Sequence, residues 1–163
     1  MIHVFVLLGG LFGLDGWADS RGMVTLADRI GKIPNVKVVT YGWSSYQTVI
    51  EDIKKISTKD KIVLVGYSGG GSRITWIANM VKKPIELLIA YDPSPAFQTL
   101  HLPDRVKKAV CYYNTSPMML GLGGGRLTGK HVETIRVSEQ HLSVQSDESL
   151  HKITIARIKE LCL

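Results

Sequence analysis

The stretch Val65-Gly66-Tyr67-Ser68-Gly69-Gly70-Gly71, VGYSGGG, sets one serine among glycines between an apolar run and an amphipathic one. The run KIVLVGY (61–67) predicts a buried strand, and SRITWIANMVKK (72–83) predicts a helix. Gly66, Ser68 and Gly70 fit the pattern G-x-S-x-G, in which a strand turns sharply into a helix with serine at the apex. Glycine two positions either side removes side-chain clashes, and free N–H groups at the helix start can stabilise an oxyanion. The alternative is a glycine-rich turn with an incidental serine.

Further apolar runs extend this pattern along the whole chain. The predicted strands are 2–8, 36–41, 61–67, 85–91, 107–113 and 132–137. Most of these runs are continuous rather than alternating, which is typical of strands buried on both faces of a parallel sheet. The predicted helices are 23–33, 45–56, the segment directly after Ser68, and 146–163. We therefore predict one α/β domain over residues 1–163, a doubly wound, mostly parallel six-stranded sheet with helices on both faces.

Two of these helices carry more detailed expectations. Ser44 and Ser45 are natural N-caps for the helix 45–56. The last helix carries apolar residues on one predicted side: Leu150, Ile153, Ile158 and Leu161.

Composition and charge narrow the function classes. The 163 residues carry a formal charge of +6, but much of the excess lies in separate lysine pairs, and no run of five basic residues occurs. We therefore expect no nucleic-acid partner, although attraction to an anionic substrate remains open. No apolar run approaches the roughly 20 residues of a membrane span. The start MIHVFVLLGG is typical of a first strand rather than a signal peptide, so we expect a cytoplasmic protein.

Neither cysteines nor glycines indicate a cofactor. Cys111 and Cys162 belong to no C-x-x-C or metal-like pattern. The cluster GLGGGRLTG (121–129) lacks the Walker pattern and does not fit G-x-G-x-x-G, so it predicts a loop bordering the site rather than a phosphate cradle. We expect no metal and no organic cofactor. The oligomeric state stays open.

With the serine turn in this strand–helix context, the sequence resembles the α/β-hydrolase superfamily, in which the turn is the nucleophile elbow. The resemblance covers nearly the whole chain as a pattern of elements, and the elbow is its specific motif. It implies a small, lid-less serine esterase or lipase-like member with Ser68 as nucleophile. The loop Gly9-Gly10-Leu11-Phe12-Gly13 is similar to the family's His-Gly-x-x-Gly oxyanion loop, with Gly9 in place of histidine. Backbone N–H groups of Leu11 and Gly69 would then form the oxyanion hole.

A serine nucleophile needs a base, and His141 is the predicted one. It follows the last predicted strand, and the carboxyl ends of parallel strands share the edge where ligands gather. The superfamily also takes its histidine from this loop. His3 and His131 stand at strand starts, at the opposite edge.

The histidine in turn needs an orienting acid, for which we predict Asp92. In the superfamily the acid usually follows the strand two after the elbow strand, but that position here is Asn114. One strand earlier the chain reads LLIAYDPSP, and some lipases of the superfamily take their acid there. Pro93 should hold Asp92 extended and end the strand. Asp104 and Asp147 remain alternatives, with Asn114 as an amide substitute.

The predicted reaction is cleavage of a carboxylic ester or thioester, on a small-molecule ester or acyl substrate, through an acyl-enzyme on Ser68. Four aromatic residues can line an acyl pocket or simply pack: Phe12, Trp17, Trp43 and Tyr67. An amidase on the same triad and a non-catalytic binding module remain the rival hypotheses.

Overall fold

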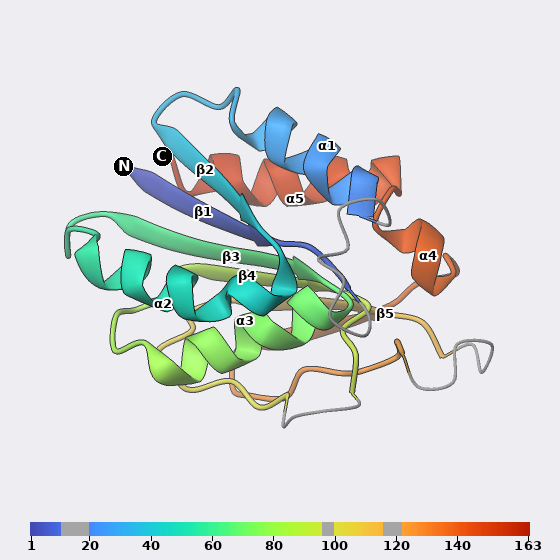
Figure 1. The fold of residues 1–163 in the computed structure, drawn as a ribbon. Helices are drawn as coiled ribbons and strands as arrows, with labels where there is room; N and C mark the ends of the chain where they lie inside the picture. The colour runs from blue at the N-terminus through green and yellow to red at the C-terminus, as the bar shows by residue number, and fades with distance from the viewer. Residues whose placement is uncertain (11–19, 96–99, 116–121) are drawn as a thin grey trace.

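The computed structural model describes residues 1–10, 20–95, 100–115 and 122–163. Its strands form one sheet in which every neighbouring pair is parallel, in the order β2-β1-β3-β4-β5-β6 (Figure 1). The strands are β1 (Ile2–Leu7), β2 (Val36–Tyr41), β3 (Lys61–Tyr67), β4 (Leu87–Tyr91), β5 (Ala109–Tyr113) and β6 (Val132–Arg136). The predicted six-stranded parallel α/β fold is therefore confirmed.

Helices cover both faces of this sheet (Figure 1). They are α1 (Arg21–Ile30), α2 (Tyr46–Lys55), α3 (Gly69–Met80), α4 (His141–Val144) and α5 (Glu148–Glu160), with a short 3-10 helix η2 (Trp43–Ser45). α1 and α5 lie on one face, and α2 and α3 on the other (Figure 1). Along β1, Val4 and Val6 pack into the first core while Phe5 and Leu7 pack into the second. This two-sided burial is why the strand sequences are continuously apolar.

The last helix packs differently from its predicted face. Leu150 and Ile158 are buried as expected, but Ile153 is 43% exposed. The side chains buried against the sheet instead include His151 and Thr154, which are 2% and 0% exposed. The hydroxyl of Tyr91 lies 2.6 Å from Thr154 Oγ1, so the face of α5 that packs on the sheet makes a polar contact. Apolar spacing alone could not reveal this face.

Two other local expectations need correction. Ser45 is the N-cap of α2, yet its side chain makes no capping hydrogen bond, because Trp43–Ser45 already form the turn η2. β4 begins at Leu87 rather than at residue 85, since Ile85 makes only an isolated bridge to Val106.

The strand order indicates which edge of the sheet can bind a ligand. The chain runs from β1 to β2 on one side and then returns to β3 on the other side of β1. The carboxyl ends of β1 and β3 therefore diverge into separate loops, and α/β sheets bind ligands at such a switch point. In the described ranges, no helix is long and apolar enough to cross a membrane.

Candidate active site

Ser68 stands at a strained turn between β3 and α3. Its backbone has φ 52° and ψ −120°, a conformation that L residues rarely adopt, and its N–H donates to the carbonyl of Tyr91 at 3.0 Å. A Cβ on Gly66 would lie 2.5 Å from the carbonyl oxygen of Gly70. The turn is thus tight enough to require glycine at this position, as the G-x-S-x-G pattern predicts.

Three side chains form a continuous hydrogen-bonded chain at this turn. His141 Nε2 lies 2.9 Å from Ser68 Oγ, and His141 Nδ1 lies 2.6 Å from Asp92 Oδ2. Since a carboxylate only accepts, Nδ1 carries the proton and Nε2 is free to accept the serine hydroxyl. The exposed fractions of Ser68, Asp92 and His141 are 8%, 1% and 6%, so little water competes for these bonds.

The backbone holds Asp92 in an unexpected conformation. Its φ is +41°, so the prediction that Pro93 keeps Asp92 extended is wrong. The Asp92 N–H donates to the carbonyl of Tyr112 at 2.7 Å, which continues the sheet pairing while the chain turns. The carboxylate Oδ1 accepts the N–H groups of Asn114 at 3.0 Å and Gly124 at 2.8 Å. These bonds leave Oδ2 directed to His141.

Asn114 and Gly123 have roles that residue type alone did not indicate. The Asn114 amide donates to the carbonyls of Glu139 at 2.6 Å and Ser138 at 3.2 Å, so it ties the end of β5 to the loop before His141. A Cβ on Gly123 would collide with both Asp92 Oδ2 and His141 Nδ1. The only available signals were the end-of-strand position of Asn114 and the glycine cluster itself.

Tyr67 contacts both the ring and the backbone of His141. Its ring centroid lies 5.2 Å from that of His141, and its hydroxyl donates to the His141 carbonyl at 3.0 Å. Tyr67 is 2% exposed, so almost none of its surface is open to a substrate. These contacts suit a residue that positions His141, and the pocket-lining role expected of Tyr67 stays a prediction.

Of the remaining predicted site residues, the structure describes Gly69 and Trp43. Gly69 is the first residue of α3, where helix N–H groups have no intrahelical acceptor. A Cβ on Gly69 would lie 3.2 Å from the Gly10 carbonyl oxygen and 3.8 Å from the Trp43 ring. The loop after β1 and Trp43 therefore both border Gly69. Leu11, Phe12 and Trp17 lie outside the described residues.

The alternative acids take other roles. Asp147 is the N-cap of α5 and accepts the N–H of Leu150 at 2.8 Å. Asp104 is exposed in the turn before β5. Neither makes a hydrogen bond to His141 among the contacts of the described residues.

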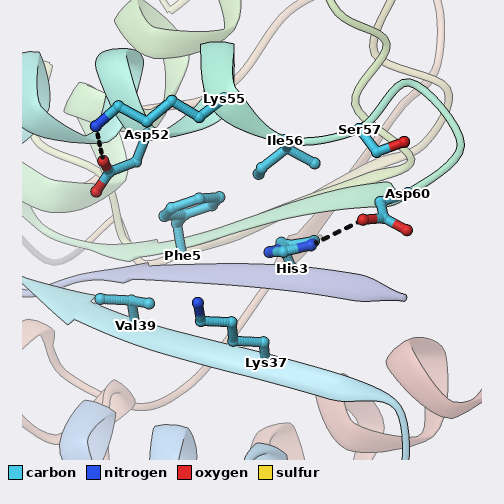
Figure 2. A pocket seen from close by; sticks show the side chains of 9 residues that line it. All are labelled: His3, Phe5, Lys37, Val39, Asp52, Lys55, Ile56, Ser57 and Asp60. Carbon is cyan, nitrogen blue, oxygen red and sulfur yellow. Dashed lines mark hydrogen bonds and ion pairs between the residues drawn. The ribbon is translucent and has the colours of Figure 1, made fainter.

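A separate pocket of about 390 Å³ lies between α2 and the edge of the sheet formed by β1 and β2 (Figure 2). Its carboxylates are already paired, Asp60 with His3 at 3.2 Å and Asp52 with Lys55 at 3.0 Å. Burial and the nearby Asp52 raise the pKa of Tyr41, which donates to that carboxylate, to about 12. None of Ser68, Asp92 and His141 lines this pocket.

In the part of the chain that the structure describes, no group of three or more His, Cys, Asp or Glu side chains could hold a metal ion. The expectation of no cofactor stays a prediction.

Neither a protein-family model nor a curated protein matches the sequence. Several solved structures, however, match the fold of this chain. Smu.1393c from Streptococcus mutans matches with a TM-score of 0.61 and 12% identity, covering 99% of this chain and 90% of that chain. Alpha/beta hydrolase domain-containing protein 10 from mouse matches with a TM-score of 0.60 and 11% identity, covering 99% and 89%. Est1E from Butyrivibrio proteoclasticus matches with a TM-score of 0.57 and 14% identity, covering 99% and 86%. The chain therefore has the α/β-hydrolase fold.

Proposed function

We propose that this protein is a serine hydrolase that cleaves a carboxylic ester or thioester through a Ser68–His141–Asp92 triad. The observation that carries the proposal is the hydrogen-bonded chain from Ser68 Oγ through both nitrogens of His141 to Asp92 Oδ2. Nucleophile, base and orienting acid thus stand in the order that acyl transfer needs. The mouse protein, whose name gives it an alpha/beta hydrolase domain, shares the fold and is consistent with a hydrolase.

The first half of the reaction forms an acyl-enzyme. Ser68 Oγ bonds to the substrate carbonyl carbon while its proton passes to His141 Nε2, 2.9 Å away. Asp92, held by two backbone N–H groups, stabilises the imidazolium. When the tetrahedral intermediate collapses, the C–O or C–S bond breaks and the leaving group takes the proton from His141.

The second half releases the acid. A water gives its proton to His141 Nε2 and its oxygen to the acyl carbon. Collapse breaks the bond to Ser68 Oγ, and that oxygen recovers the proton. In both halves negative charge develops on the carbonyl oxygen, and the N–H of Gly69 at the start of α3 is the proposed donor. The second proposed donor is the N–H of Leu11. Its chain neighbour Gly10 lies beside Gly69, which supports this assignment.

Covalent labelling tests the nucleophile directly. We expect a fluorophosphonate to add once to the wild-type protein, as measured by intact mass, and not to Ser68→Ala. The exposed Ser143, two residues after His141, supplies the control, and Ser143→Ala should label like wild type. With a p-nitrophenyl ester, Ser68→Ala should lower kcat by at least about a thousandfold. A folded wild-type sample that takes no adduct would reject the mechanism and favour a binding module.

A second assay separates the bond types. Matched ester, thioester and amide substrates with one acyl group should show turnover of the ester and thioester. Turnover of the amide at a comparable kcat/KM would instead favour the amidase hypothesis.

A further inference from the structure

Arg73 lies in the second turn of α3 and is surrounded by aromatic rings. Its guanidinium carbon lies 4.6 Å from the ring centroid of Tyr46 and 5.3 Å from those of Trp43 and Trp76. Trp76 is 39% exposed and Arg73 is partly exposed, so the cluster reaches the surface. Such contacts engage the faces of a guanidinium and leave its N–H edge as the donor of a planar fork.

The pairing of Arg73 differs from that of Arg29 and Arg157. Arg29 pairs with Glu148 and Arg157 pairs with Glu133, each at 2.8 Å. Within the residues that the structure describes, no carboxylate pairs with Arg73. Three rings therefore contact a guanidinium near the surface that no described carboxylate neutralises.

The cluster is continuous with the proposed site. Gly69, Arg73 and Trp76 stand at spacings of four and three residues on α3, so they share one helix face. Trp43 contacts Arg73 and also borders Gly69, where an added Cβ would lie 3.8 Å from its ring. Along the helix axis, Arg73 is about 6 Å from Gly69, the rise of four residues. This is the separation of the two backbone positions, and the shared contact with Trp43 places the Arg73 side chain on the same side as Gly69.

From this juxtaposition we infer that Arg73 selects substrates carrying a negatively charged group, a carboxylate in the first instance, beside the scissile carbonyl. The inference rests on the proposed function and names its substrate class. A guanidinium fork binds a carboxylate with two parallel hydrogen bonds, and the aromatic rings exclude water from one side of that pair. The formal charge of +6 adds a general attraction for anions.

The test compares two esters with one leaving group. Mono-p-nitrophenyl glutarate carries the carboxylate, and p-nitrophenyl 5-methylhexanoate replaces it with a neutral group of the same shape. We expect wild type to favour the glutarate ester in kcat/KM. Arg73→Met should lower that preference by about tenfold or more, the range of a charge-assisted hydrogen bond, while the neutral ester keeps its kcat/KM within about twofold. Arg73→Lys should retain part of the preference.

Controls separate the possible causes. Lys32→Met removes an equal charge at an exposed site just after α1 and should leave the preference unchanged. An equal fall on both esters in Arg73→Met would show a structural role and overturn the inference. So would an unchanged preference, or a wild type that favours the neutral ester. In these outcomes fluorophosphonate labelling of Ser68 persists, whereas loss of labelling in wild type rejects the proposed function and this inference with it.

Discussion

Backbone strain gathers at the residues to which we assign chemistry. Ser68 and Asp92 both have positive φ, and each directly follows a strand, β3 and β4 respectively. Their N–H groups donate across the sheet to Tyr91 and Tyr112, so sheet pairing holds both residues in place. Strain of this kind costs about 1–3 kcal/mol per residue and persists only where the surroundings enforce it. Asn35, the other described non-glycine residue with positive φ, lies in a turn and belongs to a type that tolerates this conformation.

Gly123 gives a sharp test of the His141–Asp92 contact. A methyl group at this position would occupy the space of Asp92 Oδ2 and His141 Nδ1. We therefore expect Gly123→Ala to separate the pair and to lower kcat for a p-nitrophenyl ester by about a hundredfold or more, since a misplaced base costs that much. The thermal unfolding midpoint, measured alongside, should change by only a few degrees because Gly123 lies in a loop.

Gly31→Ala is the matched control for this substitution. Gly31 follows α1 in a helical conformation, and a Cβ there would lie 3.5 Å from the nearest carbonyl oxygen, an ordinary contact. Its kcat should equal that of wild type. A Gly123→Ala protein with full activity would mean that hydrolysis does not depend on the His141–Asp92 bond.

At the scale of elements, the strand and helix positions could be predicted because burial on both faces makes each parallel strand a continuous apolar run. The same logic placed Ser68, Asp92 and His141 at one sheet edge, where the structure brings their side chains together. The face of α5 that packs on the sheet could not be predicted, because the Tyr91–Thr154 contact joins residues far apart in sequence. The role of Asn114 could not be predicted for the same reason, since its amide donates to the Glu139 carbonyl in a different loop.

The N-terminus of α5 provides a prediction that separates stability from catalysis. Asp147 caps this helix by accepting the N–H of Leu150. The pKa of its carboxyl is lowered, and the largest cause is the hydrogen bond from the Ser149 hydroxyl. Asp147→Ala should lower the free energy of unfolding by about 1 kcal/mol, the usual worth of an N-cap, as measured by urea denaturation. Ester hydrolysis should stay at the wild-type rate.

Asp92→Asn is the counterpart at the proposed triad. An asparagine cannot hold the same histidine tautomer as a carboxylate, so hydrolysis should fall by about 10³–10⁴-fold in that variant. If Asp147→Ala loses activity instead and Asp92→Asn keeps it, the orienting acid has been assigned to the wrong residue.

At the scale of the whole molecule, the proposed active site rests on a core that contains buried polar groups. His151 on α5 is 2% exposed, packs 6.3 Å from the ring of Tyr91, and donates from Nε2 to the carbonyl of Gln145 at 2.8 Å. Its Nδ1 has no hydrogen-bond partner among the described residues. A proton added there would place an unpaired charge in the core, so burial lowers the pKa of His151 below its usual value of 6.5.

This lowered pKa predicts how global stability changes with pH. As the pH falls below about 6.5, the unfolded chain takes up a proton at His151 while the folded protein does not, so stability is lost on acidification. The loss is at most about 1.4 kcal/mol per pH unit for one group. His151→Gln keeps a donor for the Gln145 carbonyl but cannot titrate, so its free energy of unfolding should change less than that of wild type between about pH 7.5 and 5.5. His131→Gln removes an exposed histidine and should follow wild type. Urea titrations at both pH values measure the difference, and equal pH slopes for wild type and His151→Gln would show that protonation of this buried ring does not limit the fold.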